Sequence, residues 1–204
     1  MPVVLTVDQR GSRRTGDAVP EVLALLDDVR MLRRFQRTVG DEVQGVADDP
    51  AGVVEVVARL LRDGGWHIGI GVGEVERPLP RDSRAGRGPA YLRARDAVTR
   101  AKSAAHRVAV VGGDRYRAEQ VETVLWLWAA LLERRTDRGW EVADVLDEGV
   151  SHADAGTRLG ITQSAVTQRA RAAGVADDRR ARRLAAQLLA ALEGAPTTDE
   201  EEER

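Results

Sequence analysis

The chain has 204 residues, of which 31% are charged and 43% are hydrophobic, and its formal net charge is −2. This length allows one mid-sized domain or two small ones, and the balanced charge argues against a protein that coats nucleic acid through an overall positive charge. The absence of cysteine excludes disulfides, thiolate metal ligands and cysteine nucleophiles. No apolar run is long enough to span a bilayer, so we expect a cytoplasmic protein without a membrane partner.

The first half of the chain alternates between strand-like and helix-like segments. Runs of β-branched or alternating apolar residues predict strands, and apolar residues spaced three and four apart predict helices. In chain order, the segments are strand 3–7, helix 20–32, strands 35–39 and 43–46, helix 53–61, strand 66–72, helix 91–105 and strand 107–111. This order predicts an α+β fold, a ferredoxin-like palm built on a split β-α-β motif with one additional helix and strand.

Strand signals vanish after Gly113, and the second half is predicted to be all helical. The expected helices are 117–136, 140–146, 151–159, 162–173 and 179–192. We therefore divide the chain into an α+β domain over 1–112, a helical domain over 113–195, and a disordered acidic tail over 196–204.

Residues 151–171 have the pattern of two helices joined by a tight turn. Ser151 and Thr162 are suited to cap the first and second helix, because their hydroxyl groups can accept a free backbone N–H. Gly160 permits the positive φ that ends the first helix, and Val166 is expected to face inward. The pattern predicts a helix-turn-helix.

The outward side chains of the second helix are short hydrogen-bonding groups and arginines, which are the types that contact base edges and phosphates in the major groove. Residues 158–183 contain seven arginines and only two acidic residues, Asp177 and Asp178, which gives this segment a net charge of +5. The alternative is a helical hairpin with a polar solvent face. The residues predicted to bind double-stranded DNA are Thr162, Gln163, Ser164, Thr167, Gln168, Arg169 and Arg171.

The segment 159–169, Leu-Gly-Ile-Thr-Gln-Ser-Ala-Val-Thr-Gln-Arg, resembles the helix-turn-helix of MarR-like and sigma-region-4-like DNA-binding proteins. No glycine-turned β-wing follows Gly174, which departs from the winged MarR pattern. The resemblance implies DNA binding and a role in the regulation of transcription.

Three carboxylates in the first half are placed where a palm would bring them together. Asp8 follows the first predicted strand, and Asp41 and Glu42 occupy the turn of the predicted hairpin. Neighbouring carboxylates can hold Mg²⁺ together with the phosphates of a substrate. The alternative is that acidic residues simply suit the turn.

Four ordered motifs, at 8–13, 38–45, 68–73 and 87–95, resemble the SatD family over roughly the first 111 residues. The same layout is more distantly similar to the palms of GGDEF proteins and class III nucleotide cyclases. That similarity implies a nucleotide and Mg²⁺ as ligands, with metal-binding acids at Asp8 and Asp41 and with Glu42 beside them. Val39 stands where the GGDEF turn has its first glycine.

Together these features predict a DNA-binding transcriptional regulator whose palm senses a nucleotide or a metal, and no catalytic residue is assigned. A single helix-turn-helix binds weakly, so we expect a homodimer formed through 117–136 or 179–192. The alternative is a Mg²⁺-dependent nucleotidyl transferase or cyclase-like enzyme whose second half is a targeting module.

Overall fold

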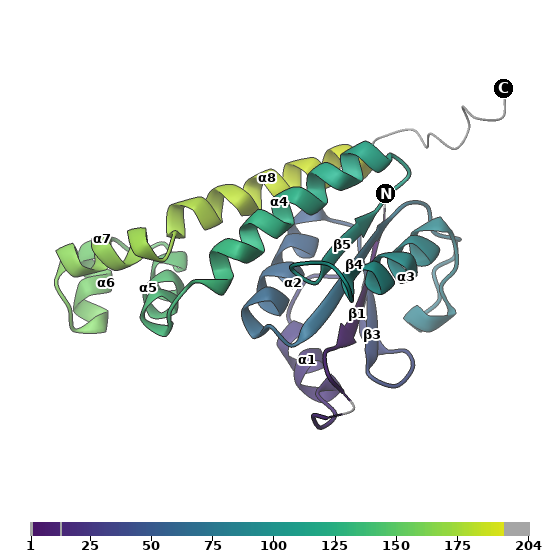
Figure 1. Ribbon diagram of the computed structural model, residues 1–204, viewed down its shortest axis with the longest axis horizontal. Coiled ribbons are helices and arrows are strands. Elements are labelled where there is room, and N and C mark those ends of the chain that lie inside the picture. The colour runs from purple at the N-terminus through teal and green to yellow at the C-terminus, as the bar shows by residue number, and fades with distance from the viewer. Residues whose placement is uncertain (1, 13, 194–204) are drawn as a thin grey trace.

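The structure, a computed structural model, describes residues 2–12 and 14–193 (Figure 1). It confirms a mixed α+β chain: within the described residues there are one five-stranded sheet and eight α-helices. The sheet occupies one end of the molecule, and two long helices lead from it to a small helical bundle at the other end. None of the helices in this part of the chain has the length and apolar character needed to cross a membrane.

The sheet has the strand order β2-β3-β1-β4-β5. All neighbouring strands are antiparallel except β4 and β5, which are parallel. Asp8, near the end of β1, lies opposite Glu42 on β3 and opposite His67 on β4. The strands are β1 (Val3–Gln9), β2 (Arg33–Arg37), β3 (Glu42–Ala47), β4 (Trp66–Val72) and β5 (Val108–Val111).

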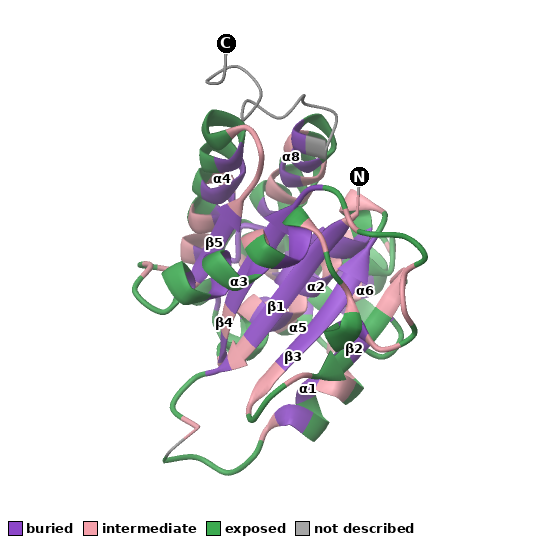
Figure 2. Cartoon of the chain, turned by 90° about the vertical axis from the view of Figure 1, so that its right-hand side faces the viewer, coloured by how far each residue is buried: buried purple, intermediate pink, exposed green. Residues whose placement is uncertain are grey.

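Helices cover both faces of the sheet. On one face, side chains of β1 such as Leu5 and Val7 pack in the largest core with helices α1 (Val19–Leu26) and α2 (Pro50–Asp63). On the other face, Val4 packs with residues of α3 (Pro89–Ala101). Figure 2 shows the central strands buried between these two layers. The alternation of side chains along β1 therefore divides its apolar residues between two cores.

The contact between β4 and α3 depends on glycine. A Cβ atom on Gly71 would lie 2.2 Å from the backbone nitrogen of Ala94, and one on Gly69 would lie 2.2 Å from that of Val98. Alternate glycines in the strand thus leave room for the helix backbone itself to approach the sheet. This gives the glycine-rich stretch 69–73 a packing role.

Two long antiparallel helices, α4 (Arg115–Glu133) and α8 (Val175–Glu193), close the first face of the sheet. Arg117 near the start of α4 donates a hydrogen bond to the carbonyl of Ala191 near the end of α8. Leu125 and Leu189 from these helices are fully buried in the same core as Leu5. The boundary expected at residue 112 falls in the β5–α4 turn, and this core includes residues from both sides of it.

A second, smaller core lies between α5 (Asp137–Asp147), α6 (His152–Leu159) and α7 (Gln163–Ala172). We call these three helices the α5–α7 bundle. Its central side chains include Val142, Ala155 and Val166, which have no exposed surface. Because α4 enters the bundle and α8 leaves it, the bundle is an insertion between two helices that belong to the larger core.

A buried ionic cluster fixes the junction between the bundle and the rest of the molecule. The carboxylate of Asp178 on α8 accepts hydrogen bonds from Trp128, Arg135 and Arg182, each at 2.9 Å. Arg135 also donates to the carbonyl of Ala173, just after α7, and its guanidinium lies over the Trp140 ring at 4.3 Å. Burial alone would raise the pKa of Asp178, but the nearby Arg182 and Arg135 outweigh it and lower that pKa.

Several predicted elements shift at their ends. The strand expected at 35–39 is Arg33–Arg37, because Val39 lies in the hairpin turn with 80% of its surface exposed. Arg33 is held there by hydrogen bonds to the carbonyls of Leu79 and Pro80. The helix expected at 20–32 ends at Leu26. The strand predicted at 66–72 is confirmed at both ends.

Replacement of Gly71 by alanine tests the close helix-sheet contact. We expect Gly71→Ala to lower the free energy of unfolding by about 3 kcal/mol, because the new Cβ would overlap the backbone of α3. Urea denaturation measures this loss. Gly16→Ala is the matched control, since a Cβ there meets nothing within 4 Å. An equal, small effect of both substitutions would contradict the packing role.

Replacement of Asp178 by asparagine tests the buried cluster. At pH 7 we expect Asp178→Asn to cost about 3 kcal/mol of unfolding free energy, because Arg135 stays buried without its counter-charge. The pKa of Asp178 is lower in the folded than in the unfolded chain, so its carboxylate stabilises the fold above about pH 4. That contribution is lost as the pH falls through the pKa of Asp178 in the folded chain. The difference in unfolding free energy between the variant and the wild type should therefore become smaller at low pH.

The control for this measurement is Asp177→Asn, at the exposed neighbouring position. If both variants lose the same unfolding free energy, or if the loss in Asp178→Asn does not change with pH, the cluster does not stabilise the fold through the charge of Asp178.

Candidate nucleic-acid interface

The turn between α6 and α7 is tight because two glycines permit it. Gly160 has φ of 64°, in the left-handed region, and ends α6. Gly156 lets the chain return closely over α6, because a Cβ atom on Gly156 would lie 2.8 Å from the carbonyl oxygen of Ile161. The N–H of Ile161 also donates a hydrogen bond to the carbonyl of Gly156. The two helices therefore cross with almost no connecting loop.

Both predicted helix caps are confirmed. The Ser151 hydroxyl accepts the N–H of Asp154 at 3.1 Å and donates to the Asp154 carboxylate at 2.6 Å. The Thr162 hydroxyl accepts the N–H of Ala165 at 3.1 Å. These caps satisfy N–H groups that the first turn of a helix leaves free, so the starts of α6 and α7 are fixed locally.

Helix α7 presents one face to the bundle and another to solvent. Val166 and Ala170 are buried in the small core. Arg169 is half-buried, while the other six predicted DNA-binding residues are exposed: Thr162, Gln163, Ser164, Thr167, Gln168 and Arg171. The exposed set forms a continuous polar surface along α7, which we call the α7 face.

One residue of the α7 face is also tied to the first helix. The Thr167 hydroxyl donates to the carbonyl of Gln163 at 3.1 Å and lies 3.0 Å from Nδ1 of His152. The sequence pattern does not indicate this contact, because His152 and Thr167 belong to different helices. The contact holds α6 and α7 together at the surface, so Thr167 helps to orient the α7 face.

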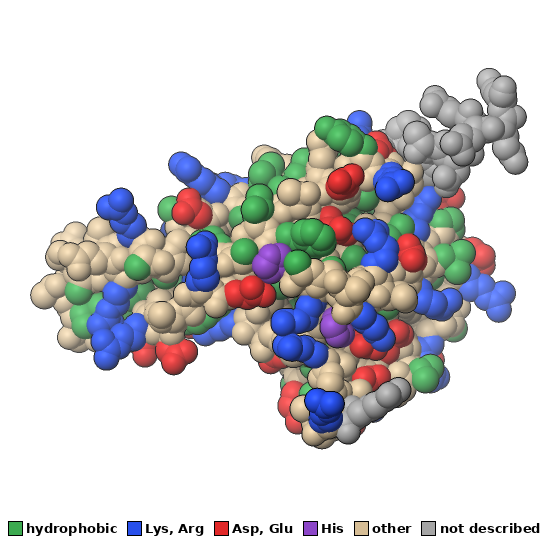
Figure 3. Space-filling view, in the orientation of Figure 1, with side chains coloured by type: hydrophobic (Ala, Val, Ile, Leu, Met, Phe, Trp, Pro, Cys, Tyr) green, Lys and Arg blue, Asp and Glu red, His purple; other side chains and the backbone are tan. Residues whose placement is uncertain are grey.

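Ion pairs reduce the basic excess that the sequence shows around α7. Arg158 pairs with Glu148, Arg179 pairs with Asp147, and Arg182 pairs with Asp178 and Glu55. Four arginines have no ion pair with any residue in the described ranges: Arg169, Arg171, Arg180 and Arg183. Figure 3 accordingly shows separate basic side chains, not one continuous basic patch, at this end of the molecule.

A hollow of about 310 Å³ lies beside the α7 face. His152, Thr167, Arg171 and Arg179 contribute to its walls. Its donors come from α6, α7 and α8, and Arg171 has no ion pair with a described residue. Most of the lining surface of this hollow is apolar, and the acidic Asp177 also lines it, so Arg171 is its one arginine without an ion pair among the described residues.

Two of the three carboxylates of the predicted palm belong to cross-strand neighbours, because Asp8 on β1 lies opposite Glu42 on β3. The Asp8 carboxylate receives the Lys102 ammonium at 3.0 Å, and the Glu42 carboxylate accepts the Thr38 hydroxyl at 2.5 Å. Asp41 contributes its backbone carbonyl to the N–H of Gln9. Within residues 2–12 and 14–193 no group of three His, Cys, Asp or Glu side chains is placed to hold a metal ion.

His67 lies beside Asp8 on the same sheet face. Burial lowers its pKa, with the Lys102 and Arg107 charges acting in the same direction, while a backbone hydrogen bond and Asp8 oppose the shift. Its Nδ1 atom is buried without a hydrogen-bond partner among the described atoms. His67 is thus a partly buried side chain at the end of the sheet, next to the Asp8–Lys102 pair.

Comparison with protein-family models, with curated proteins and with solved structures finds no significant match for this chain.

Proposed function

We propose that this protein binds double-stranded DNA through the helix-turn-helix of α6 and α7 and regulates transcription. The observation that carries the proposal is the α7 face: six exposed hydrogen-bonding or basic residues on a helix whose opposite side is anchored in its own core. A recognition helix needs this combination, because its outer side chains must be free to contact DNA while its orientation is fixed.

The order of side chains along α7 suggests how the helix would dock. Gln163, Ser164 and Gln168 are amide or hydroxyl groups of the kind that contact base edges. Arg171, one turn further on, is exposed and has no ion pair with a described residue, so it is suited to a backbone phosphate. Thr167 would contribute mainly by holding the helix in place through His152.

The α+β end supports the palm interpretation through its strand order. In β2-β3-β1-β4 every neighbouring pair is antiparallel, and α1 and α2 share one core, as in a split β-α-β arrangement. Similarity to the SatD family remains part of the proposal.

The proposed regulator acts as a homodimer through the outer surface of α4 and α8. This surface exposes three large apolar side chains: Tyr116 is 71% exposed, Leu127 is 70% exposed and Leu184 is 45% exposed. Val124 and Leu188 line a groove of about 430 Å³ on the same surface. Apolar groups gathered in one patch usually mark an interface, and two linked recognition helices bind a symmetric site better than one.

Selection from a random double-stranded DNA library by the purified protein tests the proposed function. We expect an enriched motif. On that motif, Gln163→Ala should weaken binding by about 5- to 100-fold, because a base contact contributes about 1–3 kcal/mol. Arg171→Ala should weaken binding to all sequences and reduce the slope of log affinity against log salt by about 1, because a phosphate contact is lost.

The matched control is Arg95→Ala, which removes an exposed arginine from α3, far from α7 in the fold. Failure to enrich any motif, or wild-type affinity in both α7 variants, would reject the proposal.

Introduction of a charge at Leu127 tests the dimer. We expect Leu127→Glu to shift the protein from dimer to monomer in light scattering and to weaken DNA binding at least tenfold, because only one recognition helix then engages the site. Leu92→Glu, at a position that is 66% exposed on α3, is the control. If the wild type is monomeric at micromolar concentration, or if the Leu127 variant stays dimeric, this surface is not the interface.

A further inference from the structure

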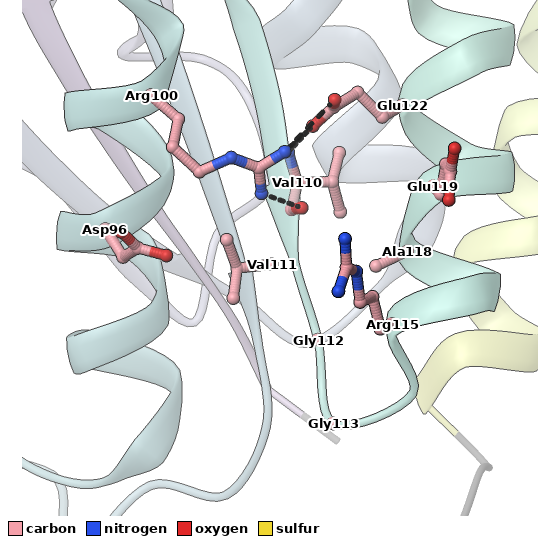
Figure 4. A pocket seen from close by; sticks show the side chains of 10 residues that line it. All are labelled: Asp96, Arg100, Val110, Val111, Gly112, Gly113, Arg115, Ala118, Glu119 and Glu122. Carbon is pink, nitrogen blue, oxygen red and sulfur yellow. Dashed lines mark hydrogen bonds and ion pairs between the residues drawn. The ribbon is translucent and has the colours of Figure 1, made fainter.

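A cavity of about 570 Å³ lies outside the proposed DNA interface, between α3 and α4 at the end of β5 (Figure 4). Its walls carry charges of both signs. Asp96 and Arg100 come from α3, Gly112 from the β5–α4 turn, and Arg115, Glu119 and Glu122 from α4. The volume is within the range of small-molecule sites.

Two of these charges are already used by the protein. Glu122, only 8% exposed, accepts the backbone N–H of Val110 at 2.7 Å and pairs with Arg100 at 3.3 Å. Arg100 in turn donates to the carbonyl of Val110 at 3.2 Å. β5 is an edge strand, so these side chains satisfy backbone groups that no further strand pairs with. Arg100 and Glu122 therefore form the back wall of the cavity.

Three other charged side chains of the cavity have no partner among the described residues. Arg115, Asp96 and Glu119 make no side-chain hydrogen bond or ion pair with any residue the structure describes. Figure 4 shows the guanidinium of Arg115 directed into the cavity from α4 and the carboxylate of Asp96 directed toward it from α3. The Arg115 cation on α4 and the Asp96 anion on α3 thus face each other across the cavity, and Glu119 adds a second anion on the α4 side.

These groups select against most anionic ligands. The five charged side chains of the lining sum to −1, so a phosphate or a nucleotide would meet Asp96 and Glu119. None of the ten lining residues is aromatic, so a base has no ring to stack on. A small molecule that carries one carboxylate and one ammonium satisfies both signs of charge. The apolar part of such a molecule would lie against Val111 and Ala118.

We propose that this cavity binds a free α-amino acid with a small aliphatic side chain. Arg115 on α4 takes its carboxylate, and Asp96 on the facing helix α3 takes its ammonium group. The assignment does not depend on the proposed DNA-binding function. Since α4 runs from this cavity to the α5–α7 bundle, the amino acid would contact the helix that leads to α7.

Isothermal titration calorimetry of the full chain with each of the twenty common amino acids tests the site. We expect saturable binding, one molecule per chain, that is strongest among alanine, valine, leucine and isoleucine. Propionate and isobutylamine, which each lack one of the two charges, should bind at least tenfold more weakly than valine. Inorganic phosphate and adenosine monophosphate should not bind at this site.

Variants connect the binding to the named residues. Arg115→Ala, and the double variant Asp96→Asn/Glu119→Gln, should each weaken valine binding at least tenfold. The altered side chains are exposed and without partners among the described residues, so thermal unfolding should stay at the wild-type temperature. Arg95→Ala, next to Asp96 on α3, is the control and should bind as the wild type does.

The proposal is overturned if none of the twenty amino acids binds. It is also overturned if phosphate or adenosine monophosphate binds in their place, or if both cavity variants keep wild-type affinity. None of these outcomes depends on whether the protein binds DNA.

Discussion

The carboxylate of Asp178 is the group on which the arrangement of the molecule depends. A buried charge is costly unless it is neutralised and hydrogen-bonded, and here the donors come from α4, from the α4–α5 turn and from α8 itself. Arg135 extends the cluster to the end of α7, and Arg182 extends it to Glu55 on α2. One anion thus connects the helices that cover the sheet with the bundle that carries the α7 face.

Local sequence signals predicted the local structure well. The caps at Ser151 and Thr162, the turn at Gly160 and the strand at 66–72 follow from short-range hydrogen bonding and side-chain periodicity. Long-range partners were not predictable in the same way. Nothing near Arg135 in the sequence indicates its pairing with Asp178. The start of β2 at Arg33 was also not predictable, because Arg33 is polar and is held by the carbonyl of the distant Pro80. The contact of Asp8 with Lys102, just after α3, was likewise not indicated by the sequence around either residue.

The candidate interface shows the same division. The outward positions on α7 could be predicted because a helix with one buried face has a known opposite face. The net charge around α7 could not be predicted in this way, because three of the seven arginines pair with acidic residues. Arg158 pairs with Glu148, Arg179 pairs with Asp147, and Arg182 pairs with Glu55 and Asp178. Arg171 remains available on the α7 face, so any DNA contact would rest on a few well-placed charges with hydrogen-bonding side chains between them.

The insertion of the α5–α7 bundle between α4 and α8 has a mechanical consequence. A bundle attached by one linker can swivel about it, whereas this bundle is attached by two antiparallel helices whose crossing is locked at Asp178. The two helices, each of 19 residues and about 28 Å long, therefore hold the bundle to the sheet end at two points of attachment.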